Sequence, residues 1–288
     1  MKLYTYRAAD GAERLAAELH NRLYDLEQFG LHYADMNALI ADSGVFLRTQ
    51  LDPTGKQPLA EPVTLCAPIP HPQQDVLCLG INYTAHAEEA SRFNGEAFGG
   101  ERPKAIYFSK RVHTASGYGD PIPSYPGLVD SLDYECELGV ILGKDAFCVQ
   151  PEQVADYIFG YTIVNDVSAR NLQTAHKQWY FGKSLDGFTP IGPWIVTADS
   201  FPVDQPMKIQ SFVNGELRQN SSIDLMIFHV AYVVSELSHG MTLTPGTIIS
   251  MGTPAGVGMG FQPPKYMKPG DVVECFVEGI GTLKNTVR

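Results

Sequence analysis

Two glutamates separated by a single residue are the first candidates for chemistry in this chain. They are Glu135 and Glu137, in a segment whose flanks are apolar and typical of β-strands. Residues i and i+2 of a strand point to the same side, so the two carboxylates are expected on one face. Adjacent carboxylates repel each other and raise each other's pKa, and a divalent cation relieves that repulsion. Oxygen-only ligation favours Mg²⁺ or Mn²⁺, with Ca²⁺ as a substitute.

A third carboxylate strengthens this metal-site hypothesis. Asp166 lies in another apolar run, between Val164 and Val167. Ionised groups inside apolar runs are rarely buried unless they are paired or bind a metal. The alternative is purely structural. Glu-x-Glu also occurs on the solvated face of antiparallel sheets, and Asn165-Asp166 can end a strand in a turn.

A histidine and a glutamate form a second candidate pair. If residues 84–92 are helical, His86 and Glu89 are spaced i, i+3 and face the same way. A glutamate beside a histidine orients the imidazole and raises its basicity, which suits a general base. The alternative is a solvated surface helix on which this pair has no role.

Two loop segments complete the set of candidates. Lys183 lies in a stretch rich in Gly, Pro and aromatic residues, where a compact cation can bind an anionic or carbonyl oxygen, unless it is simply exposed in a turn. The glycines of 250–260 permit close backbone approach to a ligand. This segment lacks the endings of a P-loop and of a dinucleotide-binding fingerprint, and the chain has no Gly-x-Ser-x-Gly.

Composition restricts the partners. The chain has 288 residues and a formal net charge of -11, without a run of Lys or Arg, which disfavours nucleic acid and anionic membranes. Its five cysteines include no Cys-x-x-Cys, so neither a disulfide framework nor a zinc site is expected. The N-terminus has no signal-peptide pattern and no stretch approaches 18 apolar residues. We expect a cytoplasmic protein that binds a small molecule.

The pattern along the chain predicts two parts. Residues 1–70 are expected to form a small N-terminal α/β domain, with a strand over 1–7, one or two helices over 12–29 and a short helix over 34–41. A proline-rich join follows, which breaks regular structure. Residues 71–288 are expected to form the catalytic domain.

That second part is rich in predicted strands. Asn214-Gly215 indicates a hairpin, and 226–238 is the one convincing amphipathic helix, with Gly240 as its stop. Helices are too few for a doubly wound sheet. We therefore expect an α+β, β-rich fold with a mixed sheet rolled around a long core. The expected strands are 75–80, 106–110, 135–142, 157–164, 193–196, 208–213, 247–250 and 272–277.

Five phrases, in this order, resemble the fumarylacetoacetate hydrolase family over residues 72–288. They are Gly80-Ile81-Asn82-Tyr83, Asp133-Tyr134-Glu135-Cys136-Glu137-Leu138, Tyr161 through Arg170, Lys183-Ser184-Leu185-Asp186-Gly187-Phe188 and Gly252-Thr253-Pro254-Ala255-Gly256-Val257-Gly258. The resemblance implies a mixed β-roll and a homodimer. It also implies that Mg²⁺ or Mn²⁺ binds to Glu135, Glu137 and Asp166.

The resemblance further implies roles at the substrate. Lys183 and Thr253 are expected to contact the substrate's oxygens, and His86 with Glu89 is expected on a lid that orders over the substrate. Arg92 and Gln173 are additional candidates for substrate contacts. The lid, from Ala87 to about Lys104, offers further candidates for the distal group of the substrate. These are Asn94, Glu96, Glu101 and Arg102.

The activity that the resemblance implies is cleavage of a C–C bond in a small anionic 2,4-diketo acid of the acylpyruvate type. The metal stabilises enolate charge, and His86, polarised by Glu89, activates water for attack on the distal carbonyl. Decarboxylation or keto–enol isomerisation, of oxaloacetate or a hydroxymuconate-type acid, uses the same metal site and is the alternative. A second alternative is an inactive metal-binding homologue.

Overall fold

Two large β-sheets form the framework of the protein in a computed structural model, which describes residues 1–94, 104–203 and 205–288, without the side chains of 90–94. The first sheet runs in the order β3-β2-β1-β12-β10-β9-β15-β5-β6, with β4 paired to β1. Its strands are β1 (Lys2–Arg7), β2 (Glu13–Leu19), β3 (Arg22–Asp25), β4 (Thr64–Leu65), β5 (Val76–Gly80), β6 (Ile106–Lys110), β9 (Cys136–Leu142), β10 (Ile158–Asn165), β12 (Ile191–Thr197) and β15 (Ile248–Ser250).

The second large sheet has the order β14-β13-β16-β17-β7. Its strands are β7 (Pro121–Ile122), β13 (Lys208–Val213), β14 (Glu216–Ser222), β16 (Val272–Val277) and β17 (Gly281–Val287). A small third sheet pairs β8 (Leu132–Asp133) with β11 (Ser168–Ala169). Most pairs are antiparallel, but β15 with β5 and β17 with β7 are parallel. The predicted β-rich fold with mixed sheets is therefore confirmed.

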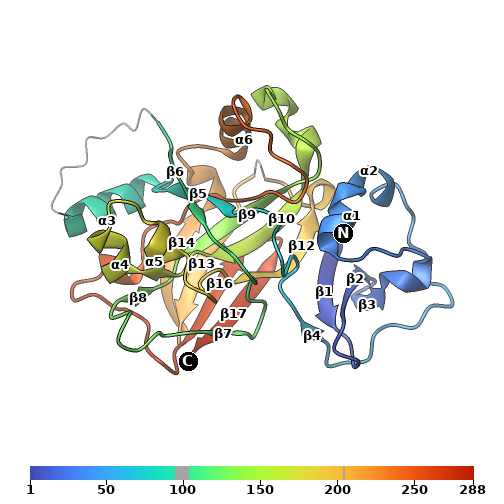
Figure 1. The fold of residues 1–288 in the computed structure, drawn as a ribbon, viewed down its shortest axis with the longest axis horizontal. Helices are drawn as coiled ribbons and strands as arrows, with labels where there is room; N and C mark the ends of the chain where they lie inside the picture. Colours follow the sequence, from blue (N-terminus) through green and yellow to red (C-terminus); the bar gives the residue numbers. More distant parts are fainter. Residues whose placement is uncertain (95–103, 204) are drawn as a thin grey trace.

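Helices cover the ends and one flank of these sheets (Figure 1). The α-helices are α1 (Met36–Ala41), α2 (Ser43–Phe46), α3 (Thr84–Asn94), α4 (Arg170–Ala175), α5 (Tyr180–Lys183) and α6 (Val230–Ser238). Short 3-10 helices are η1 (Leu26–Phe29), η2 (Pro151–Tyr157), η3 (Ala198–Ser200), η4 (Ile223–Leu225) and η5 (Gly258–Gly260). Among the described residues, none of these helices is long and apolar enough to cross a membrane.

The main core lies between the two large sheets. Val140 and Ile163 of the first sheet share one buried cluster with Val273 and Leu283 of the second. Val233 from α6 joins the same cluster. Cys136 is fully buried there, which confirms that it packs as a small apolar residue. All five cysteines are free.

The N-terminal segment lies at one end of the molecule, opposite α3 and α4 (Figure 1). Its β1 pairs with β12, so its strands continue the ten-stranded sheet. The prediction of helices over 12–29 is wrong. A hairpin of β2 and β3 occupies most of that range, and only its end, η1, is a short 3-10 helix. The turn residues His20 and Asn21 both have left-handed φ, of 50° and 60°. Pairing of β2 with β1 and β3 outweighs the leucine spacing that favoured a helix.

Other predictions of local structure agree more closely with the structure. The short helix is confirmed as α1, with Asp35 as N-cap accepting from the Ala38 N–H at 2.8 Å. The Asn214-Gly215 hairpin is confirmed. The predicted helix over 226–238 begins later, at Val230, and ends at Ser238 with His239 as C-cap. Gly240 follows as the predicted C′ residue, without a left-handed φ. The domain boundary near residue 70 stays a prediction.

Close approach of β10 to β12 generates a testable expectation. A Cβ at Gly160 would lie 2.4 Å from the carbonyl oxygen of Val196, so Gly160→Ala forces backbone apart in a buried sheet. We expect a loss of about 1–3 kcal/mol in the free energy of unfolding, measured by urea denaturation. Gly240→Ala is the matched control, because nothing lies within 4 Å of its Cβ position. Equal unfolding midpoints for the two variants would contradict the close packing.

Candidate active site

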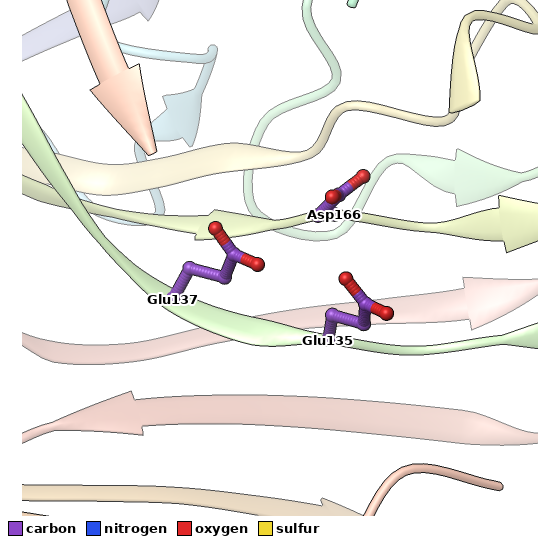
Figure 2. Close-up of side chains that lie close together, drawn as sticks. All are labelled: Glu135, Glu137 and Asp166. Carbon is purple, nitrogen blue, oxygen red and sulfur yellow. The ribbon is translucent and has the colours of Figure 1, made fainter. Parts of the chain in front are cut away.

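Three carboxylates point toward one another at the ends of two neighbouring strands (Figure 2). One oxygen from each of Glu135, Glu137 and Asp166 lies within 4.8 Å of the others. All three side chains are buried. This separation and the oxygen-only donor set suit a hard divalent cation. The structure thus brings together the three residues that the sequence predicted as ligands.

Strand pairing explains how they meet. Glu137 lies in β9 and is paired with Val164 of β10, and Glu135 directly precedes β9. Asp166 directly follows β10, and its backbone N–H donates to the carbonyl of Glu135 at 2.9 Å. Two residues from one strand end and one from the next therefore converge on a single face.

An alternating chain of ion pairs surrounds this trio. Lys183 Nζ lies 2.7 Å from both Glu135 and Asp166, and Lys110 Nζ lies 2.5 Å from the second oxygen of Asp166. Arg170 Nη2 lies 2.7 Å from Glu135. Read in order, acids and bases alternate and balance one another. The chain is Asp133–Arg170–Glu135–Lys183–Asp166–Lys110.

Glu137 stands outside that balance. Its Oε2 accepts hydrogen bonds from Ser250 Oγ at 2.6 Å and from the Gly252 N–H at 2.9 Å, and no cation among the described residues forms an ion pair with it. Burial, and then the charges of Asp166 and Glu135, raise the pKa of Glu137 well above its ordinary value. When all of its acids are ionised, the excess negative charge of the site therefore falls on Glu137.

Glu135 and Lys183 of this chain are held charged by their partners. Burial alone would raise the pKa of Glu135, but Lys183 and Arg170 outweigh it and hold that pKa far below its ordinary range. Burial opposes the charge of Lys183 as well, yet Asp166 and Glu135 raise its pKa. A divalent cation beside Glu137 would compensate the carboxylate that this network leaves unbalanced, so the residues present fit a metal.

His86 and Glu89 form a buried pair rather than a solvated one. His86 Nδ1 lies 3.0 Å from Glu89 Oε2, on helix α3, and each side chain is less than a tenth exposed. The Gly256 N–H donates to Glu89 Oε1 at 3.0 Å, which fixes the carboxylate. With Nδ1 occupied by Glu89, the imidazole presents Nε2 to a ligand.

One cavity of about 250 Å³ joins these groups. Glu135, Glu137, His86, Lys183 and Thr253 all line it. Asp166 lies behind that surface, fully buried beneath the two lysines. The remaining wall is partly aromatic and partly polar. It is formed by Leu79, Gly80, Ile81, Phe108, Arg170, Gln173, Thr174, His176, Trp179 and Met259.

Two predicted substrate contacts have defined hydrogen bonds. Gln173 Oε1 accepts from Arg170 Nη1 at 2.9 Å, so its amide N–H groups are the part available to a ligand. Thr253 Oγ1 donates to the Cys136 carbonyl at 3.0 Å and accepts from Gln219 Nε2 at 2.6 Å. The side chain of Arg92 lies outside the described residues, as do the candidates Asn94, Glu96, Glu101 and Arg102.

Sequence reasoning missed three charged members of the site. Lys110 ends β6 and gave no signal, because its partner Asp166 is distant in sequence. Arg170 stands in a quoted phrase but was given no role. Asp133 could have been found, because the alternation that pairs Glu135 with Glu137 also includes the residue two positions earlier.

Comparison with known sequences places the chain in a family. A sequence model described as the fumarylacetoacetate (FAA) hydrolase C-terminal domain matches residues 75–288. The chain belongs to the fumarylacetoacetate hydrolase family. Among curated relatives, the oxaloacetate tautomerase YisK of Bacillus subtilis (strain 168) is 44% identical over 225 residues, which cover 78% of this chain and 73% of YisK. Members of this family are enzymes, including isomerases, hydrolases and a tautomerase.

Solved structures agree with this assignment. A fumarylacetoacetate hydrolase from Exiguobacterium antarcticum superimposes with a TM-score of 0.88 and 37% identity, over 100% of this chain and 99% of that one. Maleylpyruvate hydrolase from Sphingobium sp. SYK-6, in complex with manganese(II) and pyruvate, has a TM-score of 0.78 and 27% identity, over 100% and 98% of the two chains. The whole chain, including residues 1–70, therefore has structural counterparts in this fold.

Metal affinity is expected to rise with pH. Burial raises the pKa of Glu137 above its ordinary 4.5, so between 4.5 and that raised pKa the folded protein holds a proton that Mn²⁺ must displace. Across this window, affinity measured by calorimetry should increase by up to about tenfold per pH unit and then level off.

Glu137→Gln should weaken Mn²⁺ binding by more than about 100-fold and remove this pH dependence, since loss of an outer-shell partner alone costs about 10–100-fold. Exposed Glu152→Gln is the control. A pH-independent affinity in the unaltered protein would contradict the assignment of the excess charge to Glu137.

Proposed function

We propose that this protein is a divalent-metal-dependent enzyme that interconverts the enol and keto forms of a small anionic 2-oxo acid of the oxaloacetate type. The observation that carries the proposal is the buried trio Glu135, Glu137 and Asp166, of which Glu135 and Glu137 line one cavity with His86, the partner of Glu89. A site for a Lewis acid and a site for proton transfer are both needed for chemistry through an enolate.

The trio would hold Mg²⁺ or Mn²⁺, which supplies Lewis-acid stabilisation of negative charge on the enolate oxygen. Since the ion-pair chain is balanced by itself, Glu137 and a divalent ion together leave a net positive charge at the cavity floor. Lys183 adds a charged donor that lines the cavity. An anionic substrate is therefore attracted, and its oxygens are oriented toward the floor.

His86 is the residue proposed to move the proton at carbon. In tautomerisation the enol oxygen loses one proton and the carbon next to the oxygen-bearing carbon gains one. The double bond moves from C=C to C=O, and no bond between heavy atoms is formed or broken. Glu89, fixed by the Gly256 N–H, holds His86 Nδ1 and leaves Nε2 to exchange a proton with the substrate. Both residues are buried, which keeps bulk water from competing for that proton.

Tautomerisation is ranked first because YisK, named an oxaloacetate tautomerase, is 44% identical to this chain. The second candidate is the acylpyruvate-type C–C hydrolysis that the sequence analysis placed first. It is favoured by the same buried His86–Glu89 pair, which suits activation of water, and by the similarity to maleylpyruvate hydrolase. Decarboxylation of oxaloacetate would pass through the same enolate. The intact charged groups argue against an inactive homologue.

We also propose a homodimer, and an N-terminal domain over residues 1–70 that is dispensable for the chemistry, because every residue of the proposed site lies after it. Light scattering coupled to size exclusion tests the dimer. A single monomer mass at micromolar concentration would exclude it.

A substrate panel tests the proposed reaction. With Mn²⁺ present, we expect rapid loss of the ultraviolet absorbance of enol-oxaloacetate without release of CO₂ or pyruvate, and its suppression by EDTA. Acetylpyruvate should be cleaved more slowly, as followed by pyruvate release. Faster cleavage of acetylpyruvate than tautomerisation would establish the hydrolase instead. Rapid CO₂ release from oxaloacetate would establish a decarboxylase.

His86→Asn should separate binding from turnover. Loss of a general acid–base is expected to lower kcat by about 10²–10⁴-fold. The metal affinity should stay within about threefold, because no metal ligand is touched. Exposed His113→Asn is the matched control and should leave both quantities unchanged. An unaltered kcat in His86→Asn would assign proton transfer to another group.

A further inference from the structure

Asp133 is a fully buried carboxylate that does not line the cavity. Its Oδ1 accepts from the Gly258 N–H at 2.6 Å, and its Oδ2 accepts from the Met259 N–H at 3.0 Å. Arg170 Nε donates to the same Oδ2 at 2.8 Å. One side chain therefore joins three elements that are far apart in sequence, namely β8, the start of α4 and the turn η5.

The turn η5 is held between two carboxylates. On one side a Cβ at Gly258 would lie 2.6 Å from Asp133 Oδ1. On the other side a Cβ at Gly260 would lie only 1.8 Å from Glu89 Oε1. Glycine at both positions lets the backbone touch both acids directly. The position of η5, set by Asp133, thus determines how far Glu89 can advance toward it.

The second arm of Asp133 leads to the cavity floor. Arg170, oriented by Asp133, lies 2.7 Å from Glu135 Oε1 and donates to Gln173 Oε1 at 2.9 Å. Glu135 belongs to the metal-site trio, and Gln173 lines the cavity. Asp133 therefore contacts η5, against which Glu89 packs, directly, and it reaches the floor of the site through Arg170.

We infer that Asp133 is a positioning residue, which sets the distance between the His86–Glu89 pair and the carboxylate trio by holding η5 and Arg170 together. It acts through its neighbours, since it touches neither the cavity nor the trio's ligand oxygens. The inference rests on the proposed function, in which a proton moves between His86 and a substrate held at the trio.

Asp133→Asn is the appropriate change because it preserves volume and removes acceptor capacity. The carboxylate accepts from backbone N–H groups and from Arg170 on both of its oxygens, whereas an amide replaces one acceptor oxygen by a donor. At least one of these donors then loses its partner, and η5 or Arg170 must shift. We expect kcat to fall by about 10–100-fold. The Mn²⁺ affinity should change by less than about threefold, because Asp133 touches no oxygen of the trio.

A double-mutant cycle with Glu89→Gln separates positioning from general destabilisation. If Asp133 acts through η5 on Glu89, the two losses in kcat are not additive, and Asp133→Asn costs less than about threefold in the Glu89→Gln background. Exposed Asp130→Asn is the matched control and should leave kcat unchanged. Equal losses from Asp133→Asn in both backgrounds, or a loss of Mn²⁺ affinity that matches the loss of kcat, would overturn the inference.

Two further measurements test the positioning role of Asp133. Gly260→Ala presses η5 against Glu89 without touching Asp133. If Asp133→Asn fails to fold, a double-mutant cycle of Gly260→Ala with Glu89→Gln takes the place of the first cycle. The NMR resonances of the His86 imidazole report its contact with Glu89 without turnover. They should shift in Asp133→Asn and stay in place in Asp130→Asn. Absence of turnover in the unaltered protein would refute the proposed function, whereas unshifted His86 resonances would refute this inference.

Discussion

The balanced chain of buried ion pairs is the interaction on which the site depends. Burying one charge without a partner costs several kcal/mol, so carboxylates can be concentrated here only because lysine and arginine alternate with them. Lys110 and Lys183 hold the two oxygens of Asp166, and Lys183 and Arg170 hold Glu135. This arrangement confines the excess charge to Glu137, and so defines where a cation is needed.

The two sheets serve this network by bringing distant segments into contact. The ten-stranded sheet supplies Lys110 from β6 and Glu137 from β9, which are separated in the sheet by β15 and β5. Segments at the strand ends then add further groups of the site. They are the glycine-rich turn around η5 and the helices α4 and α5. The ten-stranded sheet and helices α4 and α5 carry most of the charges, while α3 carries the His86–Glu89 pair.

The sequence predicted the parts of the site that are close in sequence and the strands that hold them. Alternation identified Glu135 and Glu137, and helical spacing identified His86 with Glu89. The burial of this pair could not be predicted from local spacing. Lys110 escaped prediction because its meaning depends on a strand pairing far along the chain. The hairpin over 13–25 was read as helix for a related reason. Leucine spacing fits both structures, and the neighbouring strand β1 decides between them.

The hydroxyl of Thr253 has a consequence for molecular recognition. Its single hydrogen is committed to the Cys136 carbonyl, and one of its lone pairs is taken by Gln219. What remains of the hydroxyl is one lone pair, an acceptor only. A carbonyl oxygen gains nothing from it, but a hydroxyl does. In the proposed reaction, Thr253 would therefore distinguish the enol from the keto form of the substrate by the position of a single hydrogen atom.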